Sequence, residues 1–446
     1  MLSKQLADFI CHVNYANLSE KTVQMTELAF LDWLGSAVAG GQKEPAQKCF
    51  RVIRALGGVP QATLPATGEK TSCINAALAN GVSSHIIELD DVHKASILHA
   101  GAAVIPAALA VAEMTGAGGR QLITAIVVGY EIAIRVGESV TPSHYYFWHT
   151  TGTCGTFGAA AAAGKLLGLN PEQMVWALGN AGTQAAGLWE FLADGAMSKH
   201  LHPGKAAQNG VLAALMARED FTGASRILEG EKGFCRATAP RFDLNKITDG
   251  LGQSTYKIEE NSFKIHSSCR HTHPAVDVTL DLVKRYGIRF AEVKDIAVGA
   301  YKTALDITDN HQPANLYAAK FSLPFCVVLA LKAGHCNPDD FSEENLFDLE
   351  IRGLMPKVTL NLDPQLNALH PERWPATVKI TTRSGQVYEG RTDYPRGDPE
   401  NPVTVSELAE KFKTLVMDIW GETKVKRVIE TILALDKVEQ ITQLFE

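Results

Sequence analysis

Runs of alanine and glycine within helical patterns constrain the fold more than any other feature of this sequence. Residues 158–164 read Gly-Ala-Ala-Ala-Ala-Ala-Gly, and several other segments in the first half of the chain carry small residues on every side. Small side chains let helix axes approach closely, and helices without a polar face are usually central ones in a large bundle. The pattern therefore predicts a compact, all-helical domain.

Helical periodicity extends from residue 1 to about residue 255 and returns near the end of the chain. Residues 20–40 place Val23, Leu28, Leu31 and Leu34 on one face and end at a glycine pair. The same periodicity, with glycines or polar turns as boundaries, predicts further helices at 101–115, 120–138, 155–168, 171–182, 204–218, 405–415 and 428–435.

The stretch between these helical regions has a different pattern. A helix is predicted at 274–286, and alternation of apolar and polar residues predicts strands at 293–301, 357–362, 377–381 and 386–390, the last two joined by a turn at 383–385. The fold class expected is mainly α, with a smaller α+β lid domain inserted into a large helical domain. The expected boundaries are 1–258 with 403–446 for the helical domain and 259–402 for the lid.

Composition excludes several classes of function. The net charge is −7 and there is no lysine- or arginine-rich tract, which argues against a nucleic-acid partner. No stretch reaches 18 apolar residues and the N-terminus has no long apolar segment, so we expect neither a membrane span nor a signal peptide. The eight cysteines are scattered without a C-x-x-C pair, which argues against structural zinc and favours reduced thiols in a cytoplasmic protein.

Ten of the fourteen histidines fall in four short groups, at 85/93/99, 144/149, 200/202 and 266/271/273. Four stretches of sequence within or around these groups also carry charges or glycine-rich turns. In the first, residues 88–99, three carboxylates and two histidines could bind a metal, transfer protons or form a solvated helix cap. Acid–base chemistry is favoured over a metal because no His-x-x-x-His or calcium-loop spacing is present.

The second and third stretches each precede a helix of small residues. In residues 148–158, His149 is expected across a helix N-terminus, although a core histidine bonded to the backbone is the alternative. In residues 197–210, Lys199 and Lys205 flank a Pro-Gly turn that opens the next helix. Lysines so close to buried helices need a counter-charge, which an anionic substrate would supply, unless both lie on the surface.

The fourth stretch, residues 260–274, combines Lys264 and Arg270 with three histidines, including His273, and Cys269. Pro274 suits the first turn of a helix, so Thr272 or His273 would cap it. A helix N-terminus flanked by two cations is suited to an anion such as a carboxylate, whereas the alternative is a solvated basic turn. There is no P-loop, nucleophile elbow, zinc helix motif or dinucleotide fingerprint.

These motifs, taken in order, resemble the MmgE/PrpD family over nearly the whole chain. The resemblance is carried by Asp32-Trp-Leu-Gly35, His85 to Pro106, His149-x-Thr-Gly-Thr, Lys199 to Gly210, Phe263 to His273, and Ala319-Lys-Phe-Ser-Leu-Pro324. The family includes 2-methylcitrate dehydratase, cis-aconitate decarboxylase and iminodisuccinate epimerase. It implies a helical domain built from both ends of the chain, an inserted α+β lid, a homodimer, and neither metal nor organic cofactor.

The resemblance also implies site residues. Its active-site positions correspond to Glu88, His99, His149, Lys199, Lys264 and Tyr301. Glu88 stands where decarboxylase members have aspartate, with a loop to His99 one residue longer, and Cys269 stands where they have histidine. We therefore count Cys269 among the catalytic candidates, and Asp91, Lys205, Arg270 and His273 among the substrate-binding ones.

The expected function is a cofactor-independent lyase acting on a small di- or tricarboxylate, most specifically a 2-methylcitrate-like dehydratase. Such reactions need histidines that exchange protons near neutral pH and cations that stabilise developing negative charge. The alternatives are a cis-aconitate-type decarboxylase, an epimerase in which Cys269 and a histidine exchange protons, and a non-catalytic carboxylate-binding protein.

Overall fold

The computed structural model describes residues 1–253 and 255–445, and the chain divides into two units. The first, called here the helical unit, comprises Met1–Ile86, Asp90–Asn261 and the described chain from Thr404 onward. The second, called here the mixed unit, comprises Ile87–Leu89 and Ser262–Val403. The prediction of a mainly helical fold with a smaller inserted α+β domain is confirmed.

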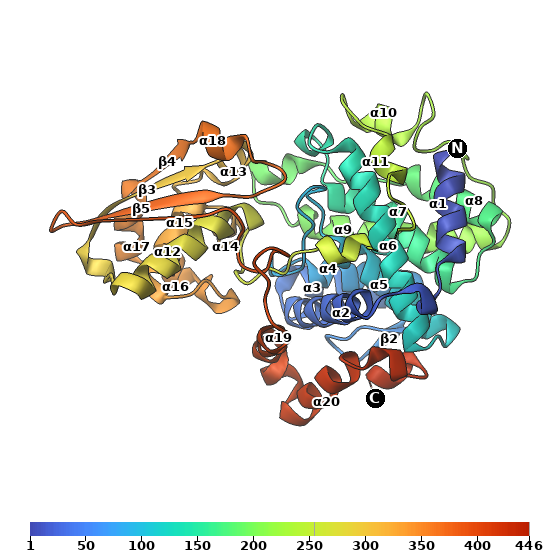
Figure 1. The fold of residues 1–446 in the computed structure, drawn as a ribbon. Coiled ribbons are helices and arrows are strands. Elements are labelled where there is room, and N and C mark those ends of the chain that lie inside the picture. The colour runs from blue at the N-terminus through green and yellow to red at the C-terminus, as the bar shows by residue number, and fades with distance from the viewer. Residues whose placement is uncertain (254, 446) are drawn as a thin grey trace. The chain divides into compact units, whose positions relative to one another are not determined.

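The centre of the helical unit is a layer of closely packed helices (Figure 1). Helix α7 contacts α5, α6 and α9, and every residue of α7 from Thr150 to Gly164 is buried. A Cβ atom at Gly158 would lie 2.5 Å from the carbonyl oxygen of Gly129, which shows how closely α6 and α7 approach. The central helices are α4 (Cys73–Ser84), α5 (Ala100–Thr115), α6 (Gly119–Val140), α7 (Thr150–Leu166) and α9 (Ser198–Arg218).

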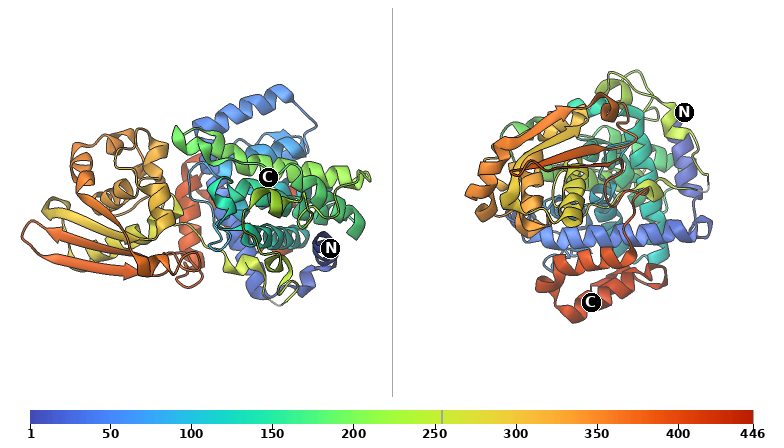
Figure 2. Two further views of the ribbon diagram at one scale, coloured as in Figure 1. Left: turned by 90° about the horizontal axis from the view of Figure 1, so that it is seen from above. Right: turned by 60° about the vertical axis from the view of Figure 1, so that its left-hand side comes forward.

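Peripheral elements cover this layer. The C-terminal helix α19 packs along α2, as the two views of Figure 2 also show, and Lys411 Nζ lies 2.5 Å from Asp32 Oδ1 across that contact. These elements are α1 (Leu2–His12), η1 (Tyr15–Asn17), α2 (Glu20–Gly41), α3 (Glu44–Leu56), β1 (Ala62–Thr63), β2 (Lys70–Thr71), η2 (His144–Tyr146), α8 (Pro171–Gly182), η3 (Trp189–Ala193), α10 (Phe234–Thr238), α11 (Asn245–Thr248), η4 (Lys257–Glu260), α19 (Val405–Trp420), α20 (Glu422–Ile432), η9 (Leu435–Lys437) and η10 (Ile441–Leu444).

The mixed unit is built on a four-stranded sheet in the order β4-β3-β5-β6. β3 (Val293–Ala300) runs parallel to β4 (Val358–Leu362) and antiparallel to β5 (Ala376–Thr382), which pairs antiparallel with β6 (Val387–Thr392). Helices α12 (His273–Tyr286) and α15 (Leu323–Ala333) pack together and share one apolar core with the sheet. Short elements complete the unit: η5 (Arg270–Thr272), η6 (Phe290–Glu292), α13 (Lys302–Thr308), α14 (Leu316–Lys320), η7 (Pro338–Asp340), α16 (Glu343–Leu346), α17 (Leu349–Leu354), η8 (Met355–Lys357) and α18 (Pro364–Asn367).

One predicted boundary was wrong in a way that matters for the site. The Pro-Gly pair at 203–204 does not form a turn before a helix, because α9 begins at Ser198 and contains both residues. A Cβ atom at Gly204 would lie 2.6 Å from the carbonyl oxygen of Leu78, so this glycine lets α9 pack directly against α4. Lys199 therefore lies in the first turn of the helix rather than in a loop.

Two further features are the state of the cysteines and the apolar character of the helices. All eight cysteines are free thiols. Among the described residues, no helix has both the length and the apolar character needed to cross a membrane.

Candidate functional site

Three helix ends in the helical unit bring histidines together. His85 is the C-cap of α4, His99 the N-cap of α5 and His149 the N-cap of α7. The backbone N–H of His99 donates to Thr151 Oγ1 at 3.1 Å, which attaches the start of α5 to the first turn of α7. Packing of α5 against α7 therefore sets where these side chains meet.

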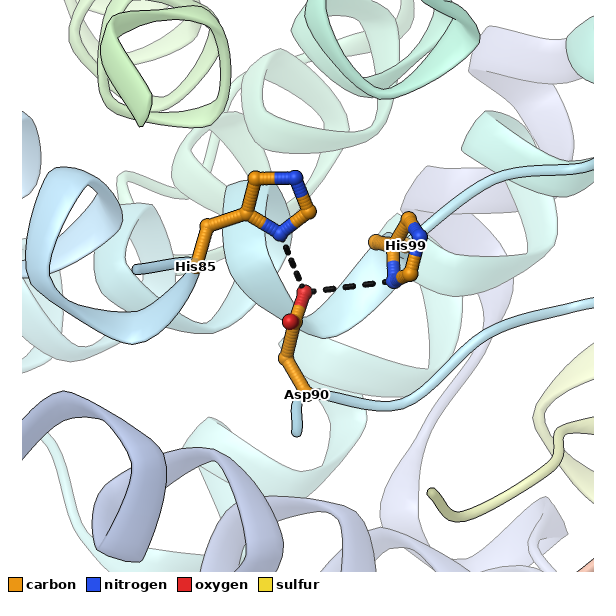
Figure 3. A group of neighbouring side chains, drawn as sticks. All are labelled: His85, Asp90 and His99. Carbon is orange, nitrogen blue, oxygen red and sulfur yellow. Dashed lines mark hydrogen bonds and ion pairs between the residues drawn. The ribbon is translucent and has the colours of Figure 1, made fainter. Parts of the chain in front are cut away.

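Asp90 lies between two of the imidazole rings (Figure 3). Its Oδ2 atom is 2.6 Å from His85 Nδ1 and 3.2 Å from His99 Nδ1. Burial raises the pKa of the Asp90 carboxyl, but the neighbouring His85 and His99 rings outweigh burial and hold that pKa well below its usual range. Asp90 is therefore ionised near neutral pH and stabilises positive charge on either ring.

His149 extends the cluster away from Asp90. Its ring stacks on that of His85 at a centroid distance of 5.5 Å and lies 6.4 Å from that of His99. His149 Nδ1 is 3.2 Å from His202 Nδ1, a contact that requires one nitrogen to donate. Burial and the nearby His202 ring hold the pKa of His149 well below its usual range, and burial lowers the pKa of His202 to about 4.

The predicted lysines differ in their environment. Lys199 is only 2% exposed, and its charge contributes to the lowered pKa of both His149 and His202. Lys205 is exposed one turn and a half further along α9, where its Nζ donates to Gln208 Oε1 at 2.7 Å. The structure thus groups Lys199 with the histidines and leaves Lys205 at the surface of the unit.

Asp91 is held in a separate network inside the helical unit. Its Oδ2 accepts hydrogen bonds from Tyr130 Oη and Asn261 Nδ2, both at 2.6 Å, and its Oδ1 accepts from the backbone N–H of Gly101 at 3.1 Å. Burial raises the pKa of Asp91 to about 7. Its backbone carbonyl faces His99 Nδ1 at 2.7 Å, so Asp91 supports the position of His99 through the main chain.

Within the mixed unit, Lys264 and Glu88 form a buried ion pair. Lys264 Nζ is 3.3 Å from Glu88 Oε2 and 3.2 Å from the Glu88 carbonyl oxygen, and both side chains are 1% exposed. Glu88 adopts a left-handed backbone conformation, with φ of 58°, which is uncommon outside glycine. Two residues assigned from the family resemblance thus contact each other directly.

Arg270 and His273 are also buried in the mixed unit. Arg270 Nη2 is 2.5 Å from Asp398 Oδ1, and Nη1 donates to the carbonyl oxygen of Arg396 at 3.0 Å. Nη1 also donates to His273 Nδ1 at 2.9 Å, which makes that nitrogen an acceptor because guanidinium can only donate. Burial and the Arg270 charge hold the pKa of His273 well below its usual range, so His273 is neutral.

The two remaining catalytic candidates lie in the mixed unit. Cys269 caps η5, is 8% exposed, and donates its backbone N–H to the Lys320 carbonyl at 2.9 Å. Tyr301 follows β3, shares a hydrogen bond of 2.7 Å with His271 Nδ1, and stacks on His370 at a centroid distance of 4.4 Å. The tyrosine hydroxyl is therefore coupled to a buried imidazole.

Two groups of described residues have metal-ligand chemistry, with ligand atoms within 4.8 Å of one another: His85, Asp90 and His99, and His93, Glu138 and Glu260. In the second group, Lys257 Nζ lies 3.1 Å from Glu138 and 3.0 Å from Glu260 and already offsets part of their negative charge. In the first, the contact of 2.6 Å between His85 and Asp90 has the length of a hydrogen bond.

Sequence reasoning did not assign roles to His85, Asp90 or His202, although all three lie in the histidine-rich stretches. The signal available in the sequence was Asp90, a carboxylate five residues after His85 and nine residues before His99. Three carboxylates occur in that segment, however, and spacing alone does not identify which one faces the imidazoles. The conformation of the loop determines which carboxylate faces the imidazoles.

The fold and the cluster together define a mainly helical protein of two units with a buried aspartate between histidines. The sequence matches the MmgE/PrpD N-terminal domain over residues 4–246 and the MmgE/PrpD C-terminal domain over residues 266–437. The chain belongs to the MmgE/PrpD family.

Three curated relatives of similar length are named for cis-aconitate decarboxylase. Cis-aconitate decarboxylase of Aspergillus terreus is 27% identical over 472 residues, covering 98% of this chain and 94% of that protein. Cis-aconitate decarboxylase of Homo sapiens is 24% identical over 483 residues, covering 99% of this chain and 93% of that protein. A cis-aconitate decarboxylase-like protein of Aspergillus oryzae is 23% identical, with coverage of 99% and 96%.

Proposed function

We propose that this protein is a lyase that removes carbon dioxide from a small tricarboxylate of the cis-aconitate type, using side chains alone. Family membership and the names of the relatives support decarboxylation. Dehydration of a 2-methylcitrate-like acid, the first expectation from the sequence, has less support because the relatives described above are all named for decarboxylation. The same cluster would serve either reaction.

The observation that carries the acid–base chemistry of this proposal is the contact between Asp90 and His99. Loss of carbon dioxide breaks a carbon–carbon bond and leaves the electron pair on the substrate, which must then accept a proton at carbon. A general acid that operates near neutral pH is therefore required. Asp90 Oδ2, 3.2 Å from His99 Nδ1, stabilises the protonated ring that delivers this proton.

His149 has a different proposed role. Burial and its neighbours hold its pKa well below the usual range, so the ring is neutral and acts as a hydrogen-bond donor or a base rather than as an acid. The buried charge of Lys199, which is felt by His149, would attract a substrate carboxylate.

The test is to incubate the protein with cis-aconitate in deuterated water and follow the mixture by proton NMR. We expect release of carbon dioxide and a new alkene product that carries one deuterium at carbon. The variant His99→Gln should lose about 10²–10⁴-fold in rate, the usual contribution of a general acid. The exposed His12, replaced in the same way, is the matched control and should keep the wild-type rate.

Other outcomes would identify the alternatives. Loss of water from a hydroxy-acid with no loss of carbon dioxide would refute decarboxylation in favour of the dehydratase. Deuterium exchange without any change in the carbon skeleton would indicate an epimerase and direct attention to Cys269. A carboxylate that raises the melting temperature but is never converted would indicate a binding protein.

The family resemblance also predicts a homodimer, which stays a prediction. Sedimentation velocity at several protein concentrations would test it, and a single species of 48.2 kDa at all concentrations would contradict it.

A further inference from the structure

The Asp90 carboxylate is shared between two imidazoles through one oxygen atom. Oδ2 is 2.6 Å from His85 Nδ1 and 3.2 Å from His99 Nδ1, whereas Oδ1 has no hydrogen-bond partner among the described residues. Asp90 and His85 are fully buried.

The positions of the ring protons follow from this geometry. An ionised carboxylate can only accept hydrogen bonds, so the Nδ1 atoms of His85 and His99 both carry hydrogen. The contact of 2.7 Å between His99 Nδ1 and the backbone carbonyl of Asp91 independently requires a hydrogen on the same nitrogen. That hydrogen also prevents Nδ1 of His99 from acting as a metal ligand, because ligation uses the lone pair.

The Nε2 atoms are consequently the basic nitrogens of both rings. His85 Nε2 is buried and has no hydrogen-bond partner among the described residues. The His99 side chain is 11% exposed, the most accessible member of the group. His99 is therefore the ring that exchanges a proton with another molecule, whereas the basic nitrogen of His85 is buried and does not take part in that exchange.

We propose that Asp90 and His85 are positioning residues: Asp90, together with the Asp91 carbonyl, holds His99 in the Nδ1–H form and stabilises its positive charge, and His85 orients the carboxylate by donating to the same oxygen. The hydrogen bond from His85 also stabilises the ionised form of Asp90, so the carboxylate does not itself take the proton that His99 carries. The kinetic part of this inference rests on the proposed function, but the tautomer assignment does not.

Ring nitrogen NMR of histidine-labelled protein tests the assignment without any substrate. We expect the rings of His85 and His99 to be protonated at Nδ1, their signals being identified by their loss in His85→Asn and His99→Gln. Free neutral histidine favours hydrogen on Nε2, so this result would be diagnostic. Rings of His85 and His99 that carry hydrogen on Nε2 and none on Nδ1 would overturn the proposal, whatever reaction the protein catalyses.

Rates then separate positioning from a general structural role. Asp90→Asn should lower the decarboxylation rate by at least about tenfold, because the charge that stabilises the protonated His99 ring is lost while the Asp91 carbonyl still keeps the hydrogen on Nδ1. His85→Asn should stay within about tenfold of wild type, because the asparagine amide N–H can replace Nδ1–H, whereas His85→Leu should lose at least tenfold more. Equal losses in His85→Asn and His85→Leu would overturn the role given to His85.

A matched control is available in the mixed unit. His335 Nδ1 and Asp340 Oδ2 form another histidine–aspartate contact of 2.6 Å, with the His335 side chain 54% exposed. Asp340→Asn should leave both the rate and the His85 and His99 tautomers unchanged. If the wild-type tautomers are as predicted and no carboxylate is decarboxylated, the proposed function fails while the assignment of Asp90 stands.

Discussion

Replacing Arg270 by methionine tests whether its charge serves the fold of the mixed unit. The guanidinium lies 2.5 Å from Asp398, with the two side chains 2% and 0% exposed, and it also donates to Arg396 and His273. Methionine keeps much of the side-chain volume but removes the positive charge. Asp398 would then be a buried carboxylate without its guanidinium partner.

The expected loss is large because a buried charge is left uncompensated. Removing one member of a buried ion pair typically costs about 3–5 kcal/mol, which corresponds to a factor of roughly 10²–10⁴ in an opening equilibrium. The double variant Arg270→Met/Asp398→Asn removes both charges and should recover more than half of the loss.

Hydrogen exchange followed by mass spectrometry measures this loss unit by unit. Peptides from α12 and α15 report on the core of the mixed unit, whereas peptides from α5 and α6 report on the helical unit and serve as the internal control. We expect faster exchange in the first set only. This design does not require the whole chain to unfold in one step.

Two results would refute the reasoning. Exchange within about threefold of wild type, together with a higher KM for the carboxylate substrate, would show that the Arg270 charge binds ligand, as the sequence had suggested. A double variant no more stable than the single one would show that Asp398 is not the group that depends on Arg270.

Three further predictions concern the helical unit. Burial lowers the pKa of His144 to about 4, so between pH 6.5 and 4 the unfolded chain binds more protons than the folded chain. The free energy of unfolding should therefore fall by about 3 kcal/mol as the pH decreases through that window. In urea unfolding at pH 7 and 4.5, His144→Gln should show a smaller pH dependence than the wild type, and an equal dependence would contradict this prediction. A Cβ atom at Gly119 would lie 1.6 Å from the Leu435 carbonyl oxygen, so Gly119→Ala should destabilise by about 1–3 kcal/mol in thermal unfolding. The exposed Arg54–Glu69 pair, 46% and 45% accessible, should contribute at most about 1 kcal/mol, so Arg54→Ala should change the melting temperature little, and less still in high salt.

The sequence alone determined many of the longer helices and the four strands of the larger sheet, because their signals are local. The helix predicted at 171–182 is α8, whose start is set by Asn170, Pro171 and Gln173 as a capping box. The hairpin of β5 and β6 was predicted from alternation around one turn, since side-chain direction in a strand depends only on neighbouring residues. Small residues in α7 indicated its central position, because the size of a side chain can be read from the sequence without knowing its neighbours in space.

The sequence also selected part of the candidate site. It singled out His99, His149 and Lys199, and the fold places the two histidine rings 6.4 Å apart, with Lys199 close enough to influence His149. Histidine and lysine are informative because few other side chains carry or exchange protons near neutral pH. Their identity could therefore be read without knowing their surroundings.

Only the tertiary structure decided which charges are compensated internally and which carboxylate faces the histidines. Arg270 and Asp398 are 128 residues apart, so no local pattern could have paired them. Glu88, Asp90 and Asp91 are chemically similar and nearly adjacent, and their directions are set by a loop in which Glu88 and Ile97 have positive φ values of 58° and 47°. Such backbone conformations are rarely predicted for residues other than glycine, because packing rather than local preference holds them. Asp90 therefore emerged as the partner of His85 and His99 only when the helices around this loop were in place.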